Sequence, residues 1–389
     1  MSRSVFLLHP CGKSLSLLCL IALLFACWET TLGLASTPSI GSHNPENVSP
    51  ELDSSKHTEV GASDLPVLVF QTSRSMVCLT TQVIQPPQAH RPPASTLVVT
   101  PTATGTYPVI LFKHGFSIPN CFYIQLLKML ASSGYIIVAP QYFTFDTDST
   151  SEVEETAKMA IWIRDSLQQV LHAVKADGSI IIPNAASLIM AGHSRGGKIA
   201  FAMALGKASS TKDDPIKFSA LVTLDPVDGP SSSSISKPQM VRDGCNHDLN
   251  HLAIPALIFG SGYGEKGVMP CAPSCCSHRG YFNCSSSPLM YHLSAVEYGH
   301  MDFLDDSSVA TDIVCPSGNM ARKQLRQFTV RLVLAFLRAT LEGSFDEMEY
   351  IVDNWENIDS VKLTEPEIYR AGDVSLQPSK SSGHGHDEL

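Results

Sequence analysis

The sequence predicts an α/β fold in which helices flank a mostly parallel central sheet, and three observations predict it. Short apolar runs of strand length recur through residues 65–343, and helical stretches separate them, as in proteins that alternate strands with helices. The middle runs are apolar without interruption, which is typical of strands buried on both faces of a parallel sheet. Finally, Gly192-His-Ser-Arg-Gly196 joins a strand-length run to an alanine-rich helical run.

Composition bounds the range of functions. The 389 residues are 44% hydrophobic, which is enough for a sizeable core. The formal net charge of −10 and the pI near 5.7 argue against nucleic acid as a partner.

The N-terminal segment predicts a secretory signal peptide over residues 1–35. Arg3 and Lys13 form a basic start, residues 14–27 form an uncharged apolar core, and Gly33-Leu-Ala35 offers a cleavage site. The apolar run is short for a membrane span, so no stable span is expected after cleavage; an uncleaved anchor is the alternative. The Ser- and Pro-rich residues 36–64 are expected to be a disordered leader.

The elements of the predicted domain follow from apolar periodicity. Ser151-x-x-Glu154 has the pattern of a capping box, and Gly343 is expected to cap the last long helix. The expected strands are 67–70, 97–100, 108–113, 135–139, 187–191, 218–224, 255–260 and 290–296. The expected helices are 122–130, 151–174, 195–205 and 321–341, with a short one near 347–355.

These elements predict one catalytic domain over residues 65–343, followed by a polar tail over 344–389. Segments 229–251 and 261–288 each follow the C-terminal end of an expected strand, where loops build the site in open α/β sheets. They are candidates for a substrate cover. The tail carries His386-Asp-Glu-Leu389, a retrieval signal of the endoplasmic reticulum (ER). With the signal peptide, it predicts a soluble ER-lumen protein that binds the retrieval receptor.

Cysteine usage agrees with an oxidising compartment. Three of the 11 cysteines would leave with the signal peptide, and the remaining eight predict disulfides of open connectivity. A zinc cluster is the alternative, but its ligand spacing is irregular, so no metal or cofactor is expected. Asn47 and Asn283 are candidate glycosylation sites. The remaining cysteines are Cys78, Cys121, Cys245, Cys271, Cys275, Cys276, Cys284 and Cys315, and the zinc alternative combines Cys271, Cys275, Cys276 and Cys284 with His278.

The Gly-x-Ser-x-Gly segment is typical of a nucleophile elbow, with Ser194 as the nucleophile. A strained turn lifts the serine hydroxyl above the sheet, and small residues at 192 and 196 let strand and helix approach closely. The helix N-terminus adds the backbone N–H of Arg195 as an oxyanion donor. A second donor should come from the loop after an earlier strand, where His114-Gly-Phe116 aims the amide of Phe116 at the oxyanion.

A serine nucleophile needs a histidine base and an orienting carboxylate, which follow the elbow in the order acid, histidine. Asp225 directly follows the expected strand 218–224, and His300 lies in the segment after the expected strand 290–296, in that order. Asp228 is the main competitor for the acid, and Glu265 is a weaker one. The other histidines fit less well: the side chain of His193 should point away from the base position, and His278 and His292 read as loop and strand residues.

Longer motifs carry a resemblance. Phe112-Lys-His-Gly-Phe116, Gly192-His-Ser-Arg-Gly-Gly-Lys198, Asp225-Pro-Val-Asp-Gly229, Cys271-Ala-Pro273, Tyr298-Gly-His-Met-Asp302-Phe-Leu304-Asp-Asp306 and Ala335-Phe-Leu337 occur in this order. Together they resemble the chlorophyllase family over about residues 65–343. The resemblance implies an α/β-hydrolase fold that cleaves the phytyl ester of chlorophyll, with Ser194, Asp225 and His300 as its triad. The magnesium in such a reaction belongs to the substrate.

The leading hypothesis is therefore a serine ester hydrolase of chlorophyllase type acting on chlorophyll or another apolar ester. A lumenal lipid esterase or general carboxylesterase on the same scaffold is the first alternative. A catalytically silent lipid- or pigment-binding protein is the second. The two ends of the chain predict the ER lumen, whereas chlorophyll resides in plastids, so plastid association stays open.

Overall fold

A computed structural model describes residues 65–371, apart from 76, 80, 145, 175–177, 232–235, 242–243, 267–269, 314 and 359–360. The expected signal peptide, leader and retrieval signal lie outside the described residues. Among the described residues, no helix has the length and apolar character needed to cross a membrane.

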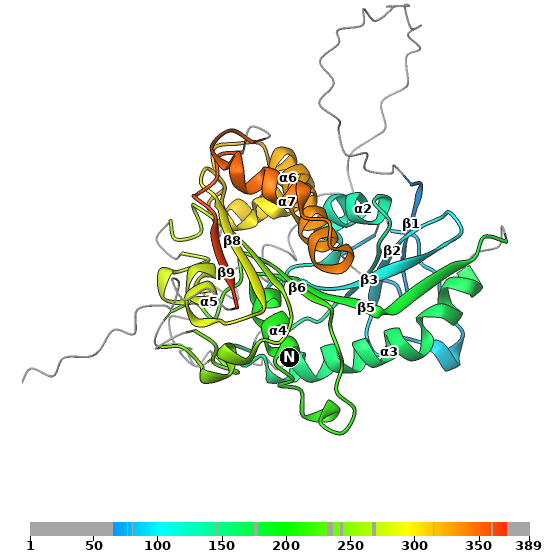
Figure 1. Ribbon diagram of the computed structural model, residues 1–389. Coiled ribbons are helices and arrows are strands. Elements are labelled where there is room, and N and C mark those ends of the chain that lie inside the picture. Colours follow the sequence, from blue (N-terminus) through cyan, green and yellow to red (C-terminus); the bar gives the residue numbers. More distant parts are fainter. Residues whose placement is uncertain are drawn as a thin grey trace, which may run out of the picture. The chain divides into compact units, whose positions relative to one another are not determined.

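Nine described strands form one twisted sheet in the order β1-β2-β4-β3-β5-β6-β7-β8-β9 (Figure 1). The six neighbouring strands from β4 to β8 are parallel, while β1, β2 and β9 pair antiparallel at the two edges. The prediction of a mostly parallel α/β sheet is confirmed, and all eight expected strands are present. The strands are β1 (Val67–Gln71), β2 (Thr96–Pro101), β3 (Gly105–Lys113), β4 (Ile136–Pro140), β5 (Ile181–His193), β6 (Ala220–Leu224), β7 (Ala256–Ser261), β8 (Leu289–Ala295) and β9 (Glu367–Arg370).

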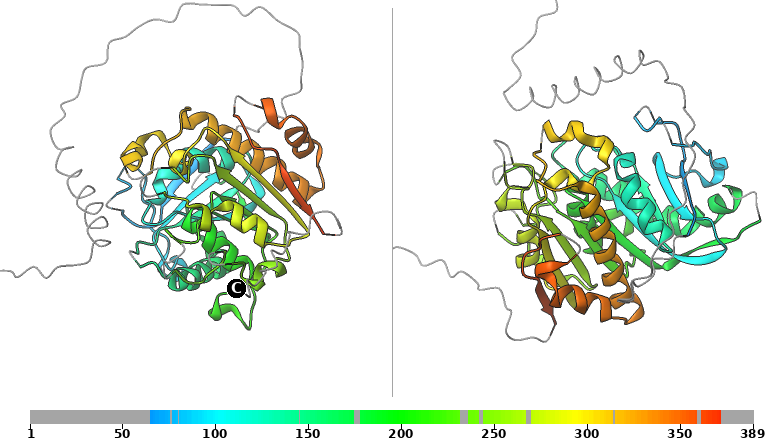
Figure 2. Two further views of the ribbon diagram at one scale, coloured as in Figure 1. Left: turned by 90° about the vertical axis from the view of Figure 1, so that its left-hand side faces the viewer. Right: turned by 90° about the horizontal axis from the view of Figure 1, so that it is seen from above.

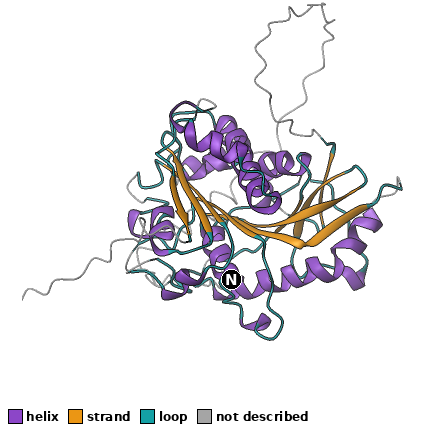
Figure 3. Cartoon of the chain, viewed as in Figure 1, coloured by secondary structure: helices purple, strands orange, loops and turns teal. Residues whose placement is uncertain are grey.

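Helices cover both faces of the sheet, so apolar side chains are buried on each side (Figures 1 and 3). α2 (Ile124–Ser132), α6 (Arg322–Leu337) and α7 (Asp346–Asp353) pack on one face. α3 (Thr150–Val174), α4 (Arg195–Ala204) and α5 (His278–Cys284) pack on the other. Figure 2 shows the sheet and its helices in two further views. This sandwich leaves the C-terminal ends of the parallel strands to carry a site.

Two helix ends show how local chemistry sets the boundaries. α3 begins at Thr150, so Ser151 lies inside the helix and the expected capping box is wrong. The Asp148 carboxylate accepts the Thr150 amide instead, at 2.9 Å. At the other end of the domain, α6 runs into a π-helical turn that stops at Gly343, whose φ of 74° confirms the expected glycine cap.

The sheet extends beyond the expected boundary at residue 343. α7 packs Met348 and Ile351 into the core, and β9 pairs antiparallel with β8. Residues 346–370 therefore belong to the α/β fold, although a polar tail was expected there. β9 left no apolar signal in the sequence, because this four-residue edge strand has no fully buried side chain.

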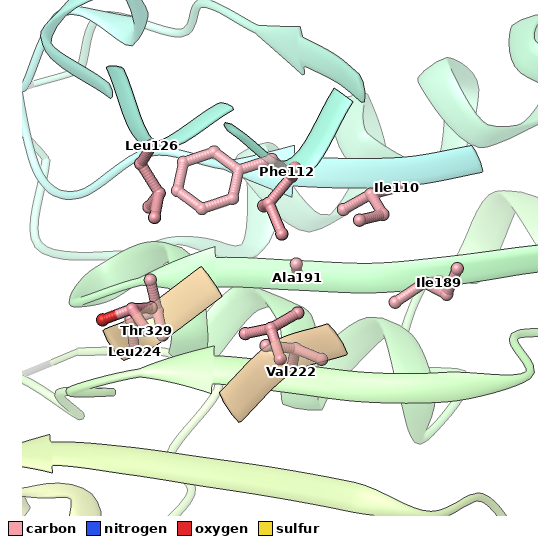
Figure 4. A pocket seen from close by; sticks show the side chains of 10 residues that line it. Ile110, Phe112, Leu126, Ile189, Ala191, Val222, Leu224 and Thr329 are labelled. Carbon is pink, nitrogen blue, oxygen red and sulfur yellow. The ribbon is translucent and has the colours of Figure 1, made fainter. Parts of the chain in front are cut away.

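A small apolar void lies inside the core between the sheet and helices α2 and α6 (Figure 4). It has room for about 10 Å³, which is less than any ester substrate needs. We therefore assign it to imperfect core packing. Its lining residues are Ile110, Phe112, Leu126, Leu130, Ile189, Ala191, Val222, Leu224, Thr329 and Val333.

Candidate active site

Ser194 sits on a sharp turn between β5 and α4. Its φ of 58° and ψ of −128° are strained for a residue with a side chain. The close approach of strand and helix requires glycine on both sides. A methyl group at Gly192 would collide with the Gly196 carbonyl, and one at Gly196 with the carbonyl oxygens of Lys113 and His114. The strand–turn–helix context expected for a nucleophile elbow is present.

The structure brings Ser194, His300 and Asp225 into one hydrogen-bonded chain. The His300 Nε2 atom lies 2.8 Å from Ser194 Oγ, and its Nδ1 atom lies 2.8 Å from Asp225 Oδ2. The three residues are 8%, 2% and 0% exposed. With Nδ1–H donating to the carboxylate, Nε2 is free to accept the serine hydroxyl proton.

Asp225 is held firmly at the end of β6. Its backbone has a φ of 43°, and its amide donates to the Phe259 carbonyl at 2.7 Å. The Ser261 hydroxyl donates to the same Oδ2 that accepts from His300. Burial alone raises the pKa of Asp225, but the hydrogen bond and charge of His300 outweigh it and hold the pKa at about 2. The carboxylate is therefore ionised at neutral pH.

The competing acids do not reach His300. Asp228 pairs through Oδ1 with the buried Lys198 ammonium at 2.8 Å. Its Oδ2 accepts the amides of Met240 and Val241, each at 2.8 Å. Glu265 is exposed. Asp228 thus organises the loop after β6 rather than the histidine.

The segment that carries His300 is fixed from α6. Asp302 accepts the amides of Gly299 at 2.6 Å and Gly318 at 2.7 Å, and its other oxygen lies 3.2 Å from Arg322 Nε. Arg322 stands at the first position of α6. Asp302, which follows His300 in the sequence motif, therefore holds the His300 loop in place.

His193 flanks the serine but turns away from it, as expected. Tyr123 Oη lies 2.8 Å from its Nδ1 atom, and the His300 carbonyl lies 2.9 Å from its Nε2 atom. Burial, and next the nearby His300, lower the pKa of His193 to about 3. His193 therefore stays neutral and supports the backbone of His300.

The neutral His193 should make stability depend on pH. Below pH 6.5 the unfolded chain takes up a proton that the folded histidine refuses, so stability is lost as pH falls. The loss approaches about 1.4 kcal/mol per pH unit and amounts to about 2 kcal/mol between about pH 7.5 and 5. Urea unfolding of wild type and His193→Gln at about pH 7.5 and 5 measures this loss. The wild-type decrease should be the larger by that amount, and equal decreases would contradict a neutral buried His193.

The loop after β3 lies against the serine from the other side. A methyl group at Gly115 would come within 3.2 Å of Ser194 Cβ, a tight contact, so glycine eases the close approach of this loop to the serine. The first turn of α4 abuts the end of β3 at Gly196. The backbones of Phe116 and Arg195, the two expected oxyanion donors, therefore belong to segments that meet beside Ser194.

A buried ionic cluster beneath this junction was missing from the sequence-based expectations. Glu152 accepts from Arg195 Nε at 2.5 Å and lies 2.9 Å from Lys113 Nζ. Burial lowers the pKa of Lys113 to about 8, against the attraction of Glu152. The cluster ties the residue after the serine to the end of β3, so it stiffens both sides of the expected oxyanion site.

The eight cysteines among the described residues form four pairs: Cys78–Cys121, Cys245–Cys284, Cys271–Cys315 and the adjacent Cys275–Cys276. The expectation of disulfides is confirmed. The five residues of the zinc alternative do not gather around one point, because Cys271 and Cys284 pair with distant cysteines. Asn283 precedes a bridged cysteine in α5.

A mostly parallel sheet with a Ser–His–Asp chain at its strand ends defines the class: the protein is an α/β-hydrolase.

Comparison with known proteins gives the family. The family model "Chlorophyllase" matches residues 67–370, so the chain belongs to the chlorophyllase family. It is 35% identical over 288 residues to Chlorophyllase-2 of Arabidopsis thaliana and 36% identical over 295 residues to Chlorophyllase-1 of that species. The two alignments cover 71% and 73% of this chain and 87% of each relative. Chlorophyllase-1, chloroplastic, of Citrus unshiu is 32% identical over 277 residues, or 68% of this chain and 78% of the relative. The chain is thus a chlorophyllase-like carboxylic ester hydrolase.

Proposed function

We propose that this enzyme hydrolyses the phytyl ester of chlorophyll to chlorophyllide and phytol, with Ser194 as nucleophile, His300 as base and Asp225 as orienting acid. The observation that carries the proposal is the hydrogen-bonded chain of these three residues in a member of the chlorophyllase family. The dry surroundings strengthen every charge interaction within that chain.

The reaction would run in two halves. Ser194 Oγ attacks the ester carbonyl while its proton passes to His300 Nε2, 2.8 Å away. Ionised Asp225 stabilises the imidazolium that forms, and the amides of Phe116 and Arg195 receive the negative oxygen. The imidazolium then protonates the departing phytol oxygen and leaves an acyl-enzyme. Water, deprotonated by His300, releases the chlorophyllide acid and restores the serine.

Product analysis tests the substrate. Purified protein incubated with chlorophyll should yield chlorophyllide and phytol, separated by chromatography, at a rate proportional to enzyme concentration. Pheophytin shares the phytyl ester but lacks magnesium. Hydrolysis of pheophytin would therefore show that the metal belongs to the substrate and is not needed for ester cleavage. If Ser194 is reactive but chlorophyll stays intact, the phytyl ester is not the substrate.

The disulfides favour a second candidate, a lumenal esterase for lipids or general carboxylic esters. Four cysteine pairs suit an oxidising compartment, and chlorophyll is not resident there. Rates on phytyl, long-chain acyl and short-chain esters separate the candidates. A clear preference for acyl esters would favour this second reading.

The catalytically silent binding protein is the third hypothesis, and covalent labelling of Ser194 tests it. A fluorophosphonate reacts with an activated serine, so Ser194 should be labelled and Ser194→Ala should not. An unlabelled wild type would support the binding protein.

We propose the ER lumen as the compartment, on the disulfides and on the His386–Leu389 motif. Glycosylation at Asn283, which is exposed on α5, belongs to the same proposal. The Citrus unshiu relative is called chloroplastic, so plastid targeting is the competing location.

Deleting His386–Leu389 should cause secretion of the protein, because retrieval of a lumenal protein depends on that signal. Immunoblots of the medium and cells measure it, with deletion of the same number of residues at 376–379 as the control. Retention of the His386–Leu389 deletion inside the ER would show that another feature holds the protein there.

A further inference from the structure

A chain of three side chains leads from the back of the candidate active site to the surface. His278 begins α5, His292 lies on β8 and Glu367 lies on the edge strand β9. These elements lie side by side (Figure 1). We call His278, His292 and Glu367 the histidine relay. None of the three was expected to act in catalysis.

Distances show which contacts of the histidine relay are made. Glu367 Oε2 lies 2.6 Å from His292 Nδ1, and His292 Nε2 lies 2.8 Å from His278 Nδ1. At the inner end, His278 Nε2 lies 3.8 Å from Asp225 Oδ1, beyond hydrogen-bond range. Among the described residues, that buried Oδ1 atom has no hydrogen-bond partner. The relay is therefore joined at its outer end and open at its inner end.

Packing holds both rings in these orientations. The His278 ring lies directly on Gly260, where a methyl group would collide with it. The Phe282 ring stacks on His292, with 5.1 Å between centroids and an interplanar angle of 21°. His278 and His292 are 7% and 0% exposed, whereas the Glu367 side chain is 39% exposed. Only the outer end of the relay meets solvent.

Counting protons explains the open inner end. With both imidazoles neutral, the pair carries two ring protons, and one of them lies between the two rings. The second proton can serve one outer nitrogen only, although carboxylates stand at both ends. The short contact at Glu367 places it on His292 Nδ1, because an ionised carboxylate only accepts. His278 then presents a lone pair to Asp225.

Two carboxylates and one guanidinium act on the histidine relay. Burial is the largest effect on His278 and lowers its pKa to about 4, although Asp225 acts in the opposite direction. The hydrogen bond from His292 lowers the pKa of Glu367. Arg279 also stands 3.6 Å from Glu367 and keeps it charged.

We propose that the histidine relay positions the charge of Asp225: Glu367 holds the outer proton, so that His278 does not donate to Asp225 Oδ1. The inference rests on the proposed function, in which Asp225 supports His300. The Oδ1 atom of Asp225 is buried and accepts no hydrogen bond from the described part of the chain. The negative charge of the carboxylate therefore acts mainly through Oδ2, to which His300 and Ser261 donate. A donor on Oδ1 would share that charge and weaken the support for the His300 imidazolium. His278, His292 and Glu367 are therefore positioning residues that act through Asp225.

The test uses a substitution at the exposed end of the histidine relay to reverse the direction of its hydrogen bonds. Lysine at position 367 can only donate, so Glu367→Lys makes His292 Nδ1 an acceptor and moves the free proton to His278 Nε2, facing Asp225. Glutamine at the same position can still accept from His292. We expect Glu367→Lys to slow fluorophosphonate labelling of Ser194 about tenfold, a typical effect of one hydrogen bond to a charged group. Glu367→Gln should stay within about twofold of wild type.

Two controls separate this effect from charge and from edge-strand stability. Glu365→Lys makes the same charge change two residues away on an exposed side chain and should label like wild type. In a His278→Phe background, Glu367→Lys should have no further effect, because no donor faces Asp225. If His278→Phe does not fold, the comparison of lysine with glutamine at position 367 decides alone.

The outcomes are distinct. Wild-type labelling rates in Glu367→Lys, equal losses in the lysine and glutamine variants, or the same loss in the His278→Phe background would each overturn the inference. A wild-type protein that is never labelled would instead overturn the proposed function.

Discussion

Replacing Ser194 with alanine is expected to reduce ester hydrolysis by roughly 10⁴-fold or more, the scale seen when a serine hydrolase loses its nucleophile. The fold should survive. The substitution removes one hydroxyl whose hydrogen bond is to His300, and alanine meets the same backbone strain at a φ of 58° as serine does. Turnover of a phytyl ester and the thermal unfolding midpoint measure the two effects.

A matched control uses a serine outside the site. Ser209→Ala removes a hydroxyl that donates to the exposed carboxylate of Glu154, so its turnover should equal that of wild type. Hydrolysis by Ser194→Ala at the rate of Ser209→Ala would contradict the assignment of the nucleophile.

Asp225→Asn is expected to lower turnover by roughly 10⁴-fold, as in the serine-protease template. An asparagine amide can donate to His300 Nδ1 and so leave the proton on Nε2, where the serine must donate. Asp225 accepts from His300 at 2.8 Å in the structure, which is the contact that the amide would reverse. Measured kcat should fall, with KM changed little.

Asp228→Asn provides the comparison because it lies three residues away and is equally buried. Its loss should leave turnover much less affected but destabilise the fold by about 3 kcal/mol, since the buried Lys198 ammonium loses its charged partner. Rates and unfolding midpoints of both variants decide between them. A severe loss of turnover in Asp228→Asn beside a nearly normal Asp225→Asn would reverse the assignment of the acid.

Apolar patterning predicted most of the fold, because eight of the strands are buried enough to leave an apolar run in the sequence. β9 was not predicted, for the opposite reason. Its residues Glu367–Arg370 are only partly buried or exposed, and it is held by backbone pairing with β8 rather than by apolar side chains. The start of α3 was misplaced by one residue, because Asp148 rather than Ser151 supplies the acceptor for the first turn.

The three residues brought together at the elbow could be proposed from the sequence because Ser194 and Asp225 directly follow buried strands and His300 lies in the short segment after another. Parallel strands end at one edge of the sheet, so side chains at those positions meet. The supporting residues have no such signature. Ser261 contacts Asp225 across 36 positions, and Glu367 reaches His292 across 75. Glu152 lies in the first turn of α3, and nothing in its local sequence indicates that Lys113 and Arg195 surround it.

The anchoring of the His300 loop on α6 has a consequence for biosynthesis. Chains emerge from the ribosome N-terminus first, so Ser194 and its elbow leave the exit tunnel long before Arg322, which holds Asp302 and thereby the histidine segment. β9, which closes the sheet beside β8, emerges later still. A nascent chain thus displays the serine without its base. Hydrolytic competence is therefore expected only after nearly the whole domain has been translated.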